Sequence, residues 1–147
     1  MVVTASIDPE LLAGRLRLAI TRTARRLRQE AGSELSPSQA AALATIERHG
    51  PLAPSELAER ERIKRPTATR VAANLEAAGL ISREADPDDA RGARLRITPA
   101  GRALVQRLRR RKTAFLAKRL SALSADEIEA LDRAAEILEG ILEEDPA

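Results

Sequence analysis

Apolar residues recur three or four positions apart along most of this chain, and that spacing is typical of amphipathic helices. In the first such segment Leu16, Ile20 and Leu27 share one face, and arginines cover much of the rest. Hydroxyl, acidic and proline residues mark helix starts, and glycines mark helix ends. The pattern predicts helices from Asp8 to about Ala31, from Ser36 to Gly50, from Pro54, from Arg65 to Gly79, from Thr98 to about Leu120 and from Ser124 to about Leu142.

The pattern changes to short apolar–polar alternation between the fourth and fifth of these helices. Leu80–Glu84 and Arg94–Ile97 alternate in this way, as half-buried strands do. The polar segment Asp86–Gly92 between them contains Pro87 and Gly92, which favour a turn. The sequence therefore predicts a two-stranded hairpin.

Together these elements predict a mainly α fold with a small β-hairpin wing, organised as one domain over residues 1–147. Residues 35–98 are predicted to form a winged helix-turn-helix, a module that reads a DNA duplex, between long terminal dimerisation helices at 8–34 and 99–147. The module cannot cover all the apolar stripes of the terminal helices, so a symmetric homodimer is favoured over a monomeric bundle. The expected dimer contacts are Leu11, Leu12, Leu16, Leu131, Leu138, Ile141 and Leu142.

The composition of the 147 residues argues against several kinds of chemistry. Without cysteine the chain has no disulfide, no thiolate metal site and no thiol redox sensor. The single histidine, His49, sits at a helix end and fits a C-terminal cap or an exposed residue better than a metal ligand. There is no Gly-rich phosphate loop and no acid–base relay, so we expect no catalytic residues, no metal and no cofactor.

Charge is unevenly distributed, although the net charge is only +3. From Ser124 onward nine acidic residues and one arginine give −8, which leaves +11 for the preceding part. A basic body favours a polyanionic partner, although charged faces are also common as plain solvated faces. Met1–Asp8 lacks the pattern of a signal peptide and no apolar run is long enough to span a bilayer, so we expect a cytoplasmic protein with no membrane partner.

The helix that begins at Arg65 has the features of a DNA-recognition helix. Helical spacing predicts an inward face made of Ala68, Val71, Ala72 and Leu75. Its N-terminal turn is small and polar, so it can enter a major groove, where Thr67 and Arg70 can bond base edges. Lys64 and Arg65 stand at its start, where phosphates would lie and where the helix dipole favours an anion. An ordinary polar surface helix would look similar, and the neighbouring hairpin shifts the interpretation towards DNA.

The turn of the hairpin carries one arginine near its tip. Arg91 can enter a minor groove, and Asp89 is close enough in sequence to hold its guanidinium in place. Asp86 and Asp88 are interpreted as turn formers. The predicted DNA-binding residues are Ser38, Ser55, Lys64, Arg65, Pro66, Thr67, Thr69, Arg70, Asp89, Arg91 and Arg94.

Three segments carry a resemblance to a known family. They are Ser55–Ala58, then Arg65–Arg70 with Leu75–Glu76 and Gly79–Leu80, and, most specifically, Asp89–Gly101, which reads Asp-x-Arg and then apolar-x-apolar-Thr-x-x-Gly. On these residues the chain resembles, over nearly its whole length, the MarR (multiple antibiotic resistance regulator) family of bacterial winged-helix transcription factors. The resemblance implies a triangular homodimer on a pseudo-palindromic operator, usually repressing transcription. For many members it also implies release by a small phenolic or other lipophilic effector bound between the two parts.

The chain departs from the family pattern in ways that bear on its partners. Ala53 replaces a capping Ser or Thr, and Lys64 replaces a small polar residue and adds a phosphate contact. With one Phe and no Trp or Tyr, few rings are left to meet a phenolic effector. Two other functions fit the elements: a DNA-compacting protein would bind scrambled and operator DNA alike, and a helical protein–protein adaptor would show no salt-dependent DNA affinity.

Overall fold

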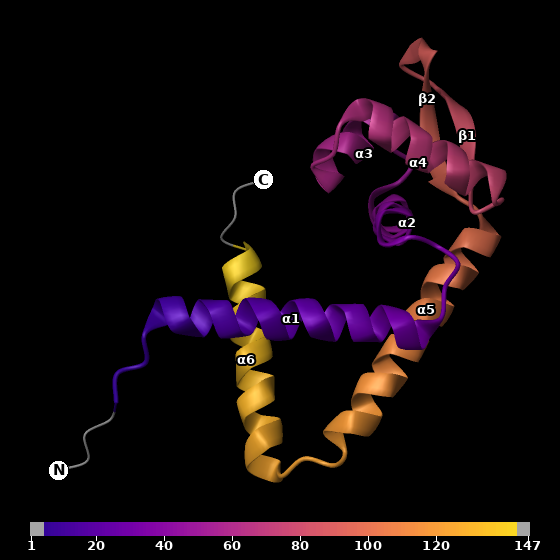
Figure 1. Ribbon diagram of the computed structural model, residues 1–147. Helices are drawn as coiled ribbons and strands as arrows, with labels where there is room; N and C mark the ends of the chain where they lie inside the picture. The colour runs from indigo at the N-terminus through magenta and orange to yellow at the C-terminus, as the bar shows by residue number, and fades with distance from the viewer. Residues whose placement is uncertain (1–4, 144–147) are drawn as a thin grey trace. The chain divides into compact units, whose positions relative to one another are not determined.

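The computed structural model describes residues 5–143, with only the backbone described at Ala90, and this part contains six helices and one two-stranded sheet. The predicted mainly α fold with a hairpin is confirmed. Met1–Thr4, which enter the prediction of location, and Glu144 and Asp145, which enter the acidic count, lie outside the described residues. The elements in Figure 1 are α1 (Pro9–Ala31), α2 (Pro37–His49), α3 (Pro54–Glu61), α4 (Arg65–Ala77), β1 (Ile81–Asp86), β2 (Asp89–Ile97), α5 (Pro99–Leu120) and α6 (Ala125–Glu143).

The chain divides into two compact units, one ending at Lys112 and the other beginning at Thr113. The boundary therefore lies inside α5. The predicted winged module ends earlier in the chain, at residue 98. None of the helices within residues 5–143 is long and apolar enough to cross a membrane.

Side-chain caps fix several of the predicted helix starts. The Ser36 hydroxyl accepts from the backbone N–H of Gln39 at 3.1 Å, and the Gln39 side chain accepts from the backbone N–H of Ser36 at 3.0 Å. Ser124 and Glu127 make the same reciprocal pair at the start of α6. Asp8 caps α1 with its carboxylate. Each cap satisfies backbone donors that a helix start would otherwise leave open.

The hairpin is longer than the alternation predicts. The register shifts beyond Ala85, so that Asp86 faces Asp89. β2 consequently begins at Asp89 rather than at Arg94, and only residues 87–88 form the turn. The predicted long turn over Asp86–Gly92 is therefore wrong, because residues 90–92 form a bulge of β2 between the pairs Ala85–Ala93 and Asp86–Asp89 and are not part of the turn.

The core lies in the first unit, among the helix-turn-helix, the hairpin and the start of α5. Leu52, just before α3, exchanges two backbone hydrogen bonds of 3.1 and 2.7 Å with Leu95 of β2, which attaches α3 to the sheet. The largest fully buried side chains are Leu43, Ile46, Leu52, Leu57, Leu75 and Leu95. The core is thus built from aliphatic residues.

Thr98 joins α5 to the end of α4. Its hydroxyl donates to the carbonyl oxygen of Gly79 at 2.7 Å and accepts from the backbone N–H of Gly101 at 3.1 Å. A Cβ at Gly101 would lie 2.1 Å from the carbonyl oxygen of Leu80, so the close approach requires glycine. The Thr-x-x-Gly part of the motif therefore has a packing cause.

Two arginines of α5 hold neighbouring helices of the first unit. Arg109 makes a two-pronged contact with the Glu47 carboxylate of α2, at 2.8 and 3.4 Å. Arg111 donates to the carbonyl oxygen of Ala31, the last residue of α1, at 2.9 Å. These contacts fix the middle of α5 against α2 and against the end of α1.

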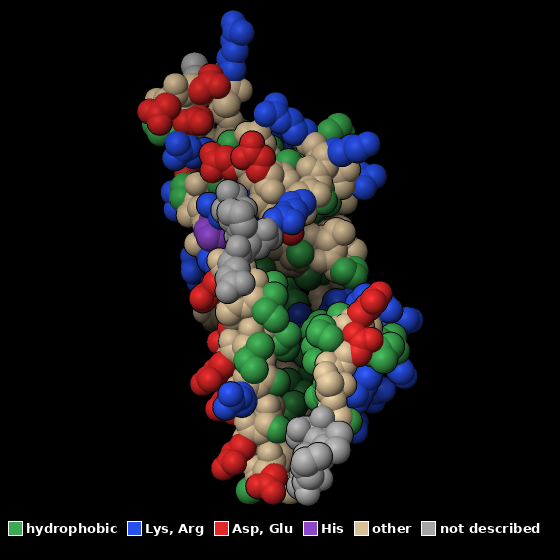
Figure 2. Space-filling view, turned by 90° about the vertical axis from the view of Figure 1, so that its left-hand side faces the viewer, with side chains coloured by type: hydrophobic (Ala, Val, Ile, Leu, Met, Phe, Trp, Pro, Cys, Tyr) green, Lys and Arg blue, Asp and Glu red, His purple; other side chains and the backbone are tan. Residues whose placement is uncertain are grey.

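Much of the apolar surface of α1 and α6 is exposed within the described chain. Leu11 of α1 is 70% exposed and Leu142 of α6 is 77% exposed, and α6 contains no buried residue. In the lower part of Figure 2, hydrophobic side chains gather along one side of α6 and acidic side chains along another. Both helices thus present apolar faces that need a further surface to cover them.

Candidate nucleic-acid interface

A tight turn between α3 and α4 sets the direction of α4. Arg62 ends α3 with φ 53°, in the left-handed region that non-glycine residues rarely adopt. Behind this turn the Ile63 backbone N–H donates to the carbonyl oxygen of Ala58 at 3.0 Å. The Thr45 hydroxyl of α2 also donates to the Glu61 carboxylate. The turn is thereby held against α2.

The two faces of α4 are divided as the spacing predicts. Ala68, Val71, Ala72 and Leu75 are buried against the core. Thr67 is half-buried at the edge of this face. The predicted DNA-binding residues that α4 and its N-cap expose are Lys64, Arg65, Pro66, Thr69 and Arg70. They lie on the outward side of the first two turns of α4 and its N-cap.

Lys64 occupies the N-cap of α4 and makes no side-chain capping bond. An ammonium group cannot accept a hydrogen bond, so the first backbone N–H groups of α4 remain open to an anion. Ala53, the N-cap of α3, likewise makes no side-chain capping bond. Ser38, which is exposed, and Ser55, which is half-buried, lie in the first turns of α2 and α3.

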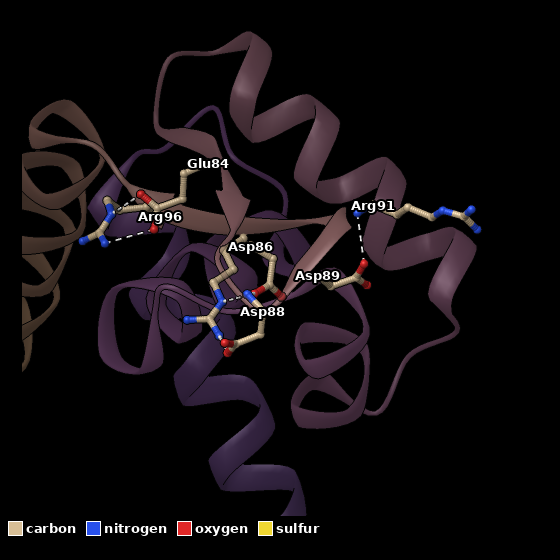
Figure 3. A network of polar contacts seen from close by, with 7 residues as sticks. Glu84, Asp86, Asp88, Asp89, Arg91 and Arg96 are labelled. Carbon is tan, nitrogen blue, oxygen red and sulfur yellow. Dashed lines mark hydrogen bonds and ion pairs between the residues drawn. The ribbon is translucent and has the colours of Figure 1, made fainter.

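The wing carries a network of arginines and carboxylates, shown in Figure 3. Arg94 Nε lies 3.5 Å from an oxygen of Asp86, and Arg94 Nη2 lies 3.7 Å from an oxygen of Asp88. Asp86 also accepts from the backbone N–H of Asp88 at 2.9 Å. The interpretation of the two aspartates as turn formers alone is therefore incomplete, because both also hold Arg94.

Asp89 acts on Arg91 differently from the prediction. Its carboxylate accepts from the backbone N–H of Arg91 at 3.0 Å, and the guanidinium extends away from it, as Figure 3 shows. The expected contact between Asp89 and the guanidinium is therefore wrong. Asp89 fixes the backbone at Arg91 and leaves the exposed side chain free to point outward.

Two further ion pairs stiffen the base of the wing. Arg96 donates to both oxygens of Glu84 at 3.0 Å, and this contact lowers the pKa of Glu84 below 4.5 and raises that of Arg96. Arg83 of β1 pairs with Glu76 near the end of α4. Sequence spacing did not reveal these pairs, because they depend on the strand register and on the packing of the hairpin beside α4.

A cavity of about 230 Å³ lies where the end of α1, the start of α2 and α5 meet in the first unit. Its polar lining includes two cations, Arg28 and Lys112. The remaining lining residues are Gln29, Ala31, Ser33, Leu35, Pro37, Ala40 and Leu108. A lining that combines apolar side chains with two cations suits a small lipophilic anion.

Within residues 5–143 no group of three or more His, Asp or Glu side chains is placed to hold a metal ion. His49 is exposed in the last turn of α2. The predicted dimer contacts are mostly exposed, with Leu138 half-buried: Leu11 70%, Leu12 38%, Leu16 37%, Leu131 48%, Ile141 59% and Leu142 77%.

Comparisons with known proteins identify the same architecture. A sequence model of the MarR family matches residues 35–92, from just before α2 into β2. An HTH-type transcriptional regulator of Mycobacterium leprae is 38% identical over 136 residues, which cover 92% of this chain and 95% of the relative.

Solved structures extend the similarity to three dimensions. A transcriptional regulator protein from Pseudomonas aeruginosa superposes with a TM-score of 0.81 and 31% identity, covering 93% of this chain and 98% of that one. A MepR variant from Staphylococcus aureus, solved bound to an oligodeoxyribonucleotide, has the same fold, with a TM-score of 0.68 and 21% identity over 93% of this chain and 99% of that one.

Proposed function

Because this chain belongs to the MarR family of helix-turn-helix transcriptional regulators, which are not enzymes, we propose that it represses transcription by binding a pseudo-palindromic operator as a homodimer. The observation that carries the proposal is the exposed outward side of the first two turns of α4 and its N-cap, where Lys64, Arg65, Thr69 and Arg70 lie. Arginine can read guanine in a major groove, and the open helix start can hold a phosphate. Acting on chromosomal DNA, the protein would work in the bacterial cytoplasm.

The remaining predicted contacts take supporting roles in this proposal. Arg91 enters the minor groove beside the half-site, where a narrow A·T-rich groove concentrates negative potential. Ser38 and Ser55, from the first turns of α2 and α3, hold the phosphate backbone. Residues 35–98 thus form the DNA-binding module, and the terminal helices at 8–34 and 99–147 form the dimerisation part. The DNA-bound MepR variant supports this use of the fold.

The exposed apolar faces of α1 and α6 support the homodimer. Leu11, Ile141 and Leu142 are each more than half exposed, which is costly for side chains of this size in a solvated monomer. A second copy covers such faces symmetrically and presents two recognition helices to two half-sites. We expect those half-sites to lie about one helical turn apart, roughly 34–36 Å.

A small lipophilic anion fits the cavity beside α1, α2 and α5 as an effector. Arg28 and Lys112 would hold its charge, while Leu35 and Leu108 would contact its apolar part. Arg109 of α5 also forms an ion pair with Glu47 of α2. A ligand bound between α5 and α2 would therefore displace α2 and, with it, the DNA-binding module. Titration with small aromatic and aliphatic carboxylates should release DNA, and Lys112→Gln should weaken that release without weakening DNA binding.

Selection of duplexes from a random library, followed by footprinting, tests the central proposal. We expect an inverted repeat protected on both half-sites, with two chains per duplex. Affinity for it should fall steeply with salt and should exceed affinity for a scrambled duplex by at least about a thousandfold. Equal affinity for both duplexes would instead identify a DNA-compacting protein, and no salt-dependent affinity would identify a protein adaptor.

A further inference from the structure

Arg94 is placed to bridge the two sides of the wing tip. Asp86 ends β1, Asp88 lies in the turn and Arg94 follows in β2, so one guanidinium contacts the segments on both sides of the bulge. The side chains of Arg94 and Asp86 are 31% and 17% exposed, whereas that of Asp88 is 86% exposed. The contact with Asp86 is therefore the more sheltered of the two.

We propose that Arg94 is a positioning residue for Arg91: by bridging Asp86 and Asp88 it fixes the wing tip, so that Arg91 is held out towards DNA. The inference rests on the proposed DNA-binding function and assigns Arg94 a role other than direct contact with DNA. Asp86 and Asp88 then assist DNA binding, although both carry the same charge sign as DNA.

Gly92 provides the mechanical connection between the bridge and Arg91. A Cβ at Gly92 would lie 3.3 Å from the Cβ of Asp86 and 3.3 Å from a carboxylate oxygen of Asp89, so the backbone beside Arg91 already packs on both aspartates. Asp89 in turn accepts from the backbone N–H of Arg91. A displacement of Asp86 therefore passes through closely packed backbone to the position of Arg91.

The direction in which DNA affinity changes distinguishes a bridge to Arg94 from simple repulsion between the two aspartates and DNA. If the two aspartates only repelled DNA, neutralising them would tighten binding and would free Arg94 to meet a phosphate. If they hold Arg94 in the bridge, neutralising them loosens the tip and weakens binding. Asn at both positions keeps an oxygen that can accept the turn hydrogen bond, so the change removes charge with little change in shape.

The first experiment measures fluorescence anisotropy of a labelled duplex that carries the sequence selected by the wild-type protein. The double variant Asp86→Asn/Asp88→Asn should bind about two- to fivefold more weakly, in the range of a partly exposed ion-pair network. Glu84→Gln is the matched control, because it removes a carboxylate from the same hairpin but one that pairs with Arg96. Glu84→Gln should not weaken DNA binding, because it leaves the bridge between Arg94 and the two aspartates in place. Unchanged or tighter binding by the double variant overturns the inference.

A double-mutant cycle between Arg94 and Arg91 shows whether one acts through the other. Arg94→Ala should weaken binding in the wild-type background and have no effect in the Arg91→Ala background. A direct phosphate contact by Arg94 would instead lower the salt slope by about one unit in both backgrounds, and that result would overturn the inference. Unfolding midpoints that match the wild type would show that these variants remain folded.

The wild-type titration separates this inference from the proposed function. If the wild-type protein binds the selected duplex and the double variant binds as well or better, only the positioning role fails. If the wild-type protein selects no sequence, the proposed function fails and the positioning role fails with it.

Discussion

Gly101 has no side chain, and this allows the first turn of α5 to pack against the carbonyl oxygen of Leu80. A Cβ at this position would lie only 2.1 Å from that oxygen. Gly101→Ala should therefore force α5 away from the core and lower the free energy of unfolding by about 1–3 kcal/mol. Urea unfolding at fixed protein concentration measures the change. Gly14→Ala is the control, because a Cβ at this position in the second turn of α1 would meet nothing within 4 Å.

Gly14→Ala should raise the free energy of unfolding by up to about 1 kcal/mol, since alanine has the higher helix propensity. A Gly101→Ala variant as stable as the wild type would contradict the packing explanation of the Thr-x-x-Gly motif. It would leave the glycine of the motif without a structural cause.

Lys64 and Arg70 should affect DNA binding in different ways, although both are exposed at the start of α4. Arg70 lies on the outward side of α4, so Arg70→Ala should cost about 1–3 kcal/mol and relax preference at one base pair. Lys64 is at the N-cap, so Lys64→Ala should weaken all sequences alike and lower the salt slope by about one unit. Anisotropy titrations on the selected duplex and its single-base variants distinguish them. A uniform loss for Arg70→Ala would refute its role in reading bases.

Single residues could be assigned from the sequence where one element alone sets their environment. The inward set on α4, including Ala68 and Leu75, follows from helical spacing and is buried as predicted. Asp86 and Arg94 could not be assigned in this way, because their contact depends on a register shift in the hairpin. Helical spacing is fixed by backbone geometry, whereas cross-strand pairing depends on where a bulge is placed.

At the scale of elements, the start of α6 should make stability depend on pH. The Ser124 backbone N–H donates to the Glu127 carboxylate, and this bond, together with the Ser124 side chain, lowers the pKa of the carboxyl below 4.5 in the folded protein. A lowered folded-state pKa means that the ionised carboxylate stabilises the fold above about pH 4.5. That stabilisation is lost as the pH falls through the lowered pKa.

Glu127→Gln isolates this effect, because glutamine can accept the same capping bond but does not titrate. The difference in free energy of unfolding between the wild type and Glu127→Gln should be constant from pH 7 to about pH 5.5. Below about pH 4.5 the free energy of unfolding of the wild type should fall relative to that of Glu127→Gln. A difference that stays the same from pH 7 to pH 3 would show that the charge of Glu127 contributes nothing to the cap.

The helix starts were predictable and the wing was not, for a common physical reason. A cap such as Ser36 with Gln39 is local, because its partners lie three residues apart. The extension of β2 back to Asp89 depends on hydrogen bonds to β1 and on a bulge that no local spacing reveals. Local chemistry therefore fixes where helices begin, while strand length is decided by pairing.

At the scale of the whole molecule, the sequence predicts the mainly α fold and the apolar stripes but not what covers them. The stripe of α6 is visible as spacing, and the structure leaves Ile141 59% exposed and Leu142 77% exposed. Spacing shows which residues share a face and does not identify the surface on which that face packs.

Ile141→Lys should separate association from folding. In the described chain Ile141 is mostly exposed, so a lysine there costs little in one copy, and the helical content should be retained. In a dimer seam the same charge would be buried, so its dissociation constant should rise at least about tenfold, equivalent to 1.4 kcal/mol. Sedimentation at micromolar concentration should give the wild type twice the chain mass of 15.9 kDa and give Ile141→Lys the lower mass. Glu139→Lys, a charge change on the acidic side of α6, should leave the dimer intact. A wild-type chain that sediments as a folded monomer, or equal effects of the two lysines, would show that the apolar face of α6 is not the seam.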